Sequence, residues 1–172
     1  MRAILFAQDS ACSKIRPRRG RSPIHSEHHR ALRHVNERLA FGSAIKTKSH
    51  AKQLQIFGIT HVINLRWSKN NTEVRKFHHI WLRFHDDKKP RPRWFYKRAL
   101  KFYRKAMKKR DTKLLVMCHH GICRSASLTY FFLRTSGKSR TKAESKIVHA
   151  RPRARVVPAY RESSEKYLRR LK

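Results

Sequence analysis

Apolar residues recur at two different spacings along this chain from about residue 38 onward. Runs that alternate or are almost continuously apolar, as in β-strands, occupy residues 39–41, 59–65, 80–84 and 114–117. Apolar residues three and four positions apart predict helices over residues 49–57, 94–109 and 125–134. Alternating strands and helices predict a single α/β domain, with a central, mostly parallel sheet flanked by helices and the segment 59–65 at the sheet centre.

Capping residues, glycine and proline mark where these helices should begin and end. Ser49 is expected to cap a helix that stops at Gly58. Thr141 and Glu144 form a capping-box pattern for a further helix, and Pro158 is expected to open a last helix that ends around residue 171. Regular structure is therefore predicted to continue almost to the end of the sequence.

The first part of the chain has neither spacing. Residues 1–34 are rich in Arg, Ser, Pro and His, so we expect a basic, flexible N-terminal arm, followed by a domain over residues 35–172. The arm either binds nucleic acid or acidic membrane lipid through its charge or is only a solubilising tail. The sequence favours neither alternative.

Positive charge dominates the composition. Lys and Arg number 44 against 10 Asp and Glu, which gives a formal net charge of +34. We therefore expect an anionic substrate or partner, and RNA, DNA and acidic lipid headgroups are polyanions that this surface would attract. Hydrophobic residues form 39% of the 172 residues, enough for one core, which excludes a wholly disordered basic tail.

The cysteine count and the apolar runs bear on the compartment. Cys12, Cys118 and Cys123 are an odd number without the spacing of a secreted disulfide scaffold, which indicates a reducing compartment and thiols kept for reactivity. No apolar run is long enough to span a bilayer, and the opening run is shorter than a signal-peptide core. We expect a soluble intracellular protein of the cytoplasm, without a transmembrane segment.

Candidate chemistry lies where a short buried strand meets a helix. Between Cys118 and Arg124 stand His119, His120, Gly121, Ile122 and Cys123. A loop of this length with a glycine can turn its backbone N–H groups toward one point, at which the next helix directs its positive end, so these residues are expected to bind phosphate. The same field stabilises a nucleophilic Cys118 thiolate, while Arg124 holds two phosphate oxygens through its planar guanidinium.

Ser125 follows the arginine directly. Its hydroxyl is expected to donate to the Cys118 sulfur, which helps the thiolate to leave when a phosphocysteine intermediate is hydrolysed. The alternative is that Ser125 serves only as an N-terminal helix cap.

Residues 118–125 resemble the signature Cys-x-x-Gly-x-x-Arg-Ser/Thr of the dual-specificity branch of the protein tyrosine phosphatases. The resemblance extends over residues 38–171 and includes residues 39–43, residues 57–65 and the pair at 151–152. It implies hydrolysis of phosphomonoesters on protein tyrosine, and also on serine and threonine, through a phosphocysteine. It also implies a general-acid aspartate about thirty residues before the cysteine, for which Asp86 fits best and Asp87 is the second choice.

The sequence departs from the family pattern at two positions. Met117 stands where a histidine is usual and Ala159 where an asparagine is common. His119 or His120 supplies part of the missing activation, or both are variable positions that face the substrate.

The end of the motif, residues 122–125, also resembles the loop of low-molecular-weight tyrosine phosphatases, which lies at the extreme N-terminus of those enzymes, so chain order favours the dual-specificity type. In this position Cys123 either forms a reversible disulfide with Cys118 on oxidation or is only a small loop residue.

Other functions remain open on the sequence alone. The same loop would serve an enzyme that acts on an RNA 5′ phosphate or on a phosphoinositide, and the extreme charge favours such polyanions. A non-catalytic, basic nucleic-acid-binding module is the alternative outside enzymes. No histidine pair is joined by a matching Cys or carboxylate set, so we expect neither a metal nor another cofactor.

Overall fold

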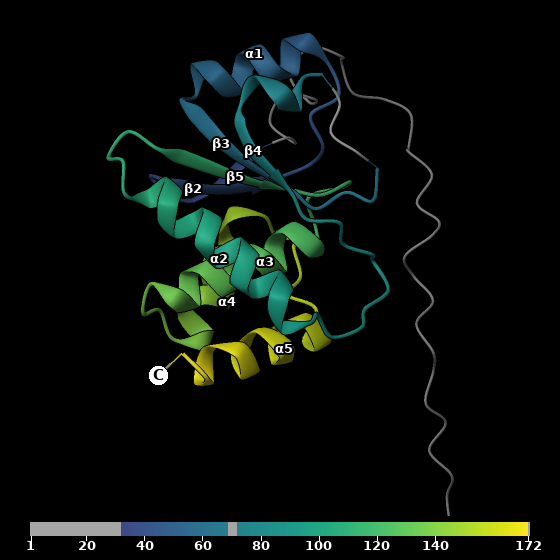
Figure 1. Cartoon of the computed structure of the whole chain (residues 1–172), viewed down its shortest axis with the longest axis vertical. Helices are drawn as coiled ribbons and strands as arrows, with labels where there is room; N and C mark the ends of the chain where they lie inside the picture. Colours follow the sequence, from purple (N-terminus) through teal and green to yellow (C-terminus); the bar gives the residue numbers. More distant parts are fainter. Residues whose placement is uncertain (1–31, 69–71, 172) are drawn as a thin grey trace, which may run out of the picture.

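The chain folds into a five-stranded sheet with helices on both faces (Figure 1). The structure, a computed structural model, describes residues 32–68 and 72–171. The strands are β1 (Leu32–Asn36), β2 (Leu39–Gly42), β3 (Ile59–Asn64), β4 (His78–Trp81) and β5 (Lys113–Met117). The helices are α1 (Lys48–Ile56), α2 (Arg93–Met107), α3 (Arg124–Thr135), α4 (Arg140–Ala150) and α5 (Pro158–Arg169), with a short 3-10 helix, η2 (Val74–Lys76). The predicted α/β class with flanking helices is confirmed.

The strand order is β1-β2-β5-β3-β4, with β1 antiparallel to β2 and the other neighbours parallel. The expectation that residues 59–65 form the sheet centre was wrong, because that place belongs to β5. Both strands read as apolar, but β5 carries four consecutive side chains with no exposed surface, whereas Thr60 and His61 of β3 are half-buried. The central strand is therefore the strand with an unbroken series of buried side chains, and not the strand with the longest apolar run.

The folded part begins earlier than the sequence predicted. β1 starts at Leu32, inside the predicted arm, and only Val35 of this strand is buried, so its apolar pattern is weak. The side-chain oxygen of Asn36 accepts from the amides of Arg38 at 2.9 Å and Leu39 at 2.7 Å, which closes the hairpin to β2. The rest of the predicted arm, residues 1–31, lies outside the described residues.

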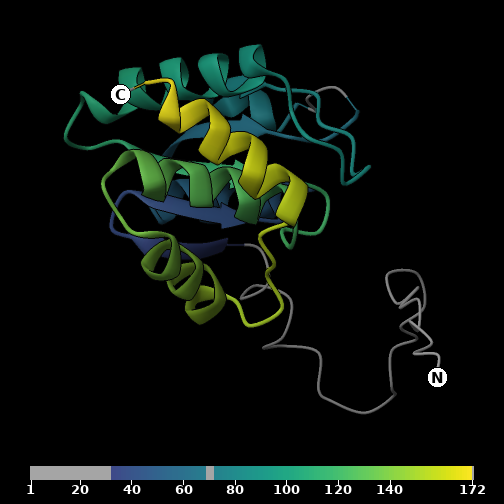
Figure 2. The ribbon, with the colours of Figure 1, turned by 90° about the horizontal axis from the view of Figure 1, so that it is seen from below.

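The two sheet faces carry different helices. α1 covers one face, where Ala51 and Leu54 pack with Val62 and Met117. α2, α3 and α4 cover the other face, and α5 lies outermost, across α3 (Figures 1 and 2). α3 is buried along almost its whole length because it lies between the sheet and α5.

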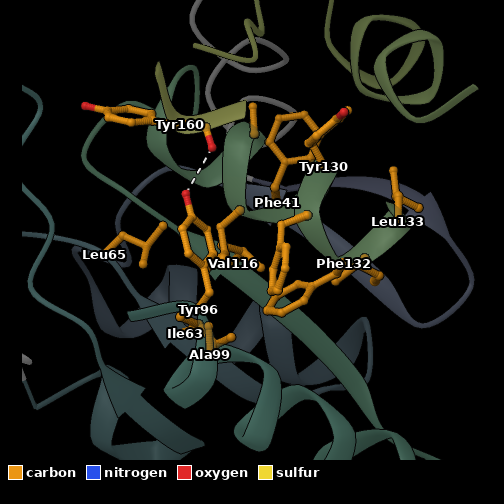
Figure 3. Close-up of a cluster of buried hydrophobic side chains, with 14 of the residues drawn as sticks. Phe41, Ile63, Leu65, Tyr96, Ala99, Val116, Tyr130, Phe132, Leu133 and Tyr160 are labelled. Carbon is orange, nitrogen blue, oxygen red and sulfur yellow. Dashed lines mark hydrogen bonds between the residues drawn. The ribbon is translucent and has the colours of Figure 1, made fainter. Parts of the chain in front are cut away.

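Aromatic side chains fill the core between α2, α3 and α5 (Figure 3). The hydroxyl of Tyr96 donates to the carbonyl of Tyr160 at 3.0 Å, which links α2 to α5. The ring of Phe84, just beyond β4, makes edge contacts with Phe95 and Tyr160 at centroid distances of 4.9 and 4.7 Å. These contacts fix the segment that follows β4, which carries the candidate general acid.

Two of the predicted helix caps were wrong by two residues. Thr47, not Ser49, caps α1 and accepts from the amide of His50 at 3.1 Å. Ser139, not Thr141, caps α4, because the chain is still extended there, at φ −63° and ψ 163°, and its side chain accepts from the amide of Lys142. Pro158 opens α5 as predicted.

Candidate active site

The cysteine loop joins the central strand to the buried helix α3. Cys118 follows β5 directly, and its amide donates to the carbonyl of Gly42 at the end of β2 at 3.2 Å. Its Sγ accepts from the amide of Gly121 at 3.2 Å and lies 3.3 Å from the Oγ of Ser125. An N–H group, a hydroxyl and the N-terminus of α3 therefore surround a sulfur on a side chain that is only 2% exposed.

Gly121 is the one loop position where a side chain would not fit. Its φ is +68°, and a Cβ there would lie 2.4 Å from the carbonyl carbon of Gly42. The guanidinium of Arg151 donates to its carbonyl at 3.0 Å, and the amide of Arg155 donates to that of Ile122 at 3.0 Å. Two hydrogen bonds from the segment before α5 therefore hold the loop. Sequence reasoning did not predict this role for Arg151.

The Arg124 guanidinium is held by main-chain carbonyls of the segments that follow β3 and β4. Its Nη1 donates to Phe84 at 3.0 Å and to Leu65 at 3.4 Å, and the residue is 8% exposed. These carbonyls orient the planar fork before any ligand binds. The arrangement brings Arg124 to the same end of the sheet as Cys118.

The two candidate carboxylates have different surroundings. Asp86 approaches Arg124, with 3.4 Å between its Oδ2 and the arginine Nε. Asp87 pairs instead with Arg91 and accepts from the amide of Lys89 at 3.0 Å. Although burial acts in the opposite direction, this hydrogen bond and the Arg91 charge hold the pKa of Asp87 below its usual value. Asp86 is therefore the carboxylate that the structure brings to the loop.

Residues of α5 anchor the segment that carries Asp86. The hydroxyl of Tyr160 donates to the carbonyl of His85 at 3.3 Å and accepts from the amide of Lys88 at 2.9 Å. The amide of Arg91 donates to Ser163 at 3.2 Å. Burial raises the pKa of Tyr160, so its hydroxyl keeps its proton for this contact. These anchors lie more than seventy positions away in the chain, and sequence reasoning missed them.

The remaining loop side chains differ in their exposure to solvent. His119 and His120 are exposed, with ring centroids 4.4 Å apart. Burial, followed by the positive charges of His120, Arg66, Lys46 and Arg124, lowers the pKa of His119, which indicates a positive field at the mouth of the site. Ile122 and Cys123 are half-buried, and no disulfide joins Cys118 to Cys123.

The described residues contain no cluster of three or more His, Cys, Asp or Glu side chains that would hold a metal ion. Cys12 lies outside the described part of the chain.

An aromatic cluster includes His85, the residue before Asp86. The ring of Trp67 lies on that of His85 with centroids 3.5 Å apart, and Trp67 is 49% exposed. The guanidinium of Arg83 lies over both Trp67, at 4.4 Å, and Trp81, at 4.9 Å. Sequence reasoning did not identify this cluster, because Trp67 and His85 come from two separate loops of the chain.

A parallel strand, a cysteine loop whose Gly121 amide donates to the sulfur and a helix that begins at an arginine define the class of cysteine-based phosphatases. The family model described as "Dual specificity phosphatase, catalytic domain" matches residues 41–163, and the chain therefore belongs to the dual specificity phosphatases. No curated protein matches the sequence at a significant level.

Solved structures share the fold. The human tyrosine phosphatase-like serine/threonine/tyrosine-interacting protein is 22% identical with a TM-score of 0.73, and the match covers 83% of this chain and 98% of that one. Human DUSP28 is 23% identical with a TM-score of 0.70, over 81% and 94%. PTPMT1 in complex with PI(5)P is 15% identical with a TM-score of 0.71, over 81% and 96%. Within the described residues, no helix is long and apolar enough to cross a membrane.

Proposed function

We propose that this chain hydrolyses phosphomonoesters on proteins, phosphotyrosine first and also phosphoserine and phosphothreonine, through a phosphocysteine intermediate. The observation that carries the proposal is the surroundings of the Cys118 sulfur. It accepts from the Gly121 amide, contacts the Ser125 hydroxyl and lies at the N-terminus of a buried helix that begins with Arg124. Such surroundings would suit a nucleophilic sulfur and would hold a phosphate dianion beside it.

In the first step the Cys118 thiolate attacks phosphorus. An S–P bond forms while the P–O bond to the substrate breaks, and Asp86, once protonated, gives its proton to the leaving oxygen. Arg124 exchanges its contact with Asp86 for two phosphate oxygens and stabilises the charge on them in the transition state. Proton donation of this kind contributes about 10² to 10⁴ in rate.

In the second step water attacks the phosphocysteine. Asp86 takes a proton from the water, the S–P bond breaks, and inorganic phosphate leaves. The thiolate is the leaving group, and the Ser125 hydroxyl, 3.3 Å from the sulfur, donates to it as its charge develops.

Phosphoinositide hydrolysis is the second candidate. PTPMT1, which shares the fold, was crystallised with PI(5)P. Lys46, Arg66 and Arg124 add positive charge around His119 at the mouth of the site, which would suit a headgroup with several phosphates.

Phosphate release from matched substrates tests the proposal. A phosphotyrosine peptide, a phosphoserine peptide, a phosphoinositide in micelles and an RNA with a 5′ phosphate are compared by kcat/KM, with Cys118→Ser as the control. We expect the phosphotyrosine peptide to give the highest value and Cys118→Ser to give none. A higher value for the inositide or the RNA would reverse the order. Binding without turnover in the unaltered chain would identify a non-catalytic module.

A further inference from the structure

The outer face of α2 carries a continuous line of cationic side chains. We call it the basic stripe, and it consists of Lys97, Arg98, Lys101, Arg104, Lys105 and Lys108. All six are exposed, and at 100° per residue they occupy a sector of about 120° on the helix surface. The opposite face, which includes Phe95 and Ala99, is buried in the core. Figure 2 shows α2 at the edge of the helical layer, and no part of the chain that the structure describes buries these six side chains.

Within residues 32–68 and 72–171, no acidic side chain forms an ion pair with the basic stripe. Among the described residues, every ion pair joins side chains outside α2, and the first turn of this helix has no acidic residue. Like charges four positions apart, such as Lys97 with Lys101 and Lys101 with Lys105, destabilise a helix. A surface that served only solubility would mix both signs. The stripe is therefore a surface that an anionic partner would stabilise.

An exposed indole heads the stripe. Trp94 is 52% exposed and lies three and four positions before Lys97 and Arg98, on the same side of the helix. An aromatic ring among cations is the combination that binds single-stranded nucleic acid, because the ring stacks on an unpaired base while the cations follow the backbone. A membrane fits less well, because the apolar face of α2 is buried and the stripe exposes no aliphatic side chain.

We propose that the basic stripe and Trp94 bind single-stranded nucleic acid, with phosphodiesters along the stripe and a base on the indole. A short turn joins the end of α2 to the start of β5, so the helix and the strand run in opposite directions. The first residues of α2 therefore lie at the same end of the sheet as Cys118, which follows β5. The Trp94 end of a bound strand therefore lies toward the catalytic loop. The proposal does not depend on the phosphatase activity.

Binding of a labelled RNA to the full chain tests the proposal. The probe is a single-stranded oligouridylate of about 12 nucleotides with hydroxyl groups at both ends, so that the cysteine loop has no phosphomonoester to bind. The α2 variant combines Lys97→Gln, Lys101→Gln and Lys105→Gln. The matched control combines Lys138→Gln, Lys142→Gln and Lys146→Gln, exposed lysines around the start of α4 that remove the same charge.

We expect the α2 variant to bind at least about tenfold more weakly and to lower the slope of log K against log salt by about 2, while the control stays close to the unaltered chain. Trp94→Ala should weaken binding by about fivefold or more at an unchanged slope. Equal losses in both triple variants would overturn the proposal. So would α2-dependent binding of anionic vesicles without α2-dependent binding of RNA.

Crosslinking of 4-thiouridine RNA to the unaltered chain gives a second readout that needs no variant. The crosslinked peptide should come from α2. A crosslink that maps only to other segments would contradict the proposal. Because the probe has no terminal phosphate, neither readout depends on phosphatase activity.

Discussion

The carboxylate of Asp86 lies 3.4 Å from the guanidinium of Arg124, whereas the neighbouring Asp87 is bound to Arg91. Two adjacent residues of the same type therefore have different partners, one in the candidate site and one outside it. The anchor from Tyr160 to the carbonyl of His85 keeps this difference, because it fixes the backbone one residue before Asp86.

Exchange of each aspartate separates the two roles. Asp86→Asn should lower kcat by about 10² to 10⁴ for an alkyl phosphate, because the leaving oxygen loses its proton donor. Asp87→Asn should change kcat only slightly and reduce stability by about 1 kcal/mol or less, since its ion pair with Arg91 is exposed. Steady-state kinetics with an alkyl and an acidic aryl phosphate would measure this. A larger loss in Asp87→Asn would reverse the assignment of the general acid.

Ser125→Ala should slow the breakdown of the phosphocysteine more than its formation. The buried hydroxyl is 3.3 Å from the sulfur, and a hydrogen bond to a charged group corresponds to about 10- to 100-fold in rate. Rapid-quench kinetics should then show a burst of leaving group before a slow steady state. Ser127→Ala is the control, because Ser127 Oγ accepts from the amide of Val157 and has no contact with the sulfur. If Ser125→Ala showed no burst and an unchanged kcat, Ser125 would have no role in the breakdown of the phosphocysteine.

Gly121→Ala and Gly137→Ala distinguish loop fit from backbone strain. Both glycines have positive φ, +68° and +84°, so alanine costs about 1 to 2 kcal/mol at either position. Only at Gly121 would the Cβ also meet backbone, 2.4 Å away, and displace the phosphate loop. We expect both variants to lose thermal stability but only Gly121→Ala to lose phosphatase activity. Equal activity in the two would contradict the loop geometry.

Stability should fall in acid through Glu165. Burial acts against its charge, but hydrogen bonds from Arg134 and Tyr130 lower the pKa of Glu165 from 4.5 to about 2. A depressed folded-state pKa contributes stability that is complete above about pH 4.5 and is lost as the pH falls toward about 2, up to roughly 3 kcal/mol. Urea unfolding at about pH 6 and about pH 3 should show this loss, and Glu165→Gln should remove most of it.

A matched control for Glu165 is Glu144→Gln, because Glu144 forms a half-exposed pair with Arg161. This change should leave the pH dependence of unfolding almost intact. If Glu165→Gln kept the full pH dependence, another group would be responsible.

The loop and its strand could be predicted from the sequence because they are local. Leu114 to Met117 form a continuous apolar run, and Cys118, Gly121 and Arg124 follow within a few residues, so neighbouring positions define both the strand and the loop. α2 and α5 were predicted for the same reason, from spacing and from the proline at the first turn.

What the sequence missed depends on contacts between distant segments. Tyr160 and Arg151 support the Asp86 segment and the loop, but nothing near them in the sequence shows which backbone groups they meet. β1 has one buried residue, so its pairing with β2, rather than its own pattern, makes it a strand. The choice of β5 as central strand likewise depends on the whole sheet order.

Isolation of the phosphorylated enzyme tests the central claim most directly. Unaltered chain is mixed with a ³²P-labelled phosphotyrosine peptide, quenched within milliseconds in alkaline detergent, in which an S–P bond survives, and digested, and the labelled peptide is identified by mass spectrometry. The account predicts about one phosphate per chain at most, attached to Cys118, and none in Cys118→Ser. Steady release of phosphate by Cys118→Ser, or a label on any other residue, would contradict it.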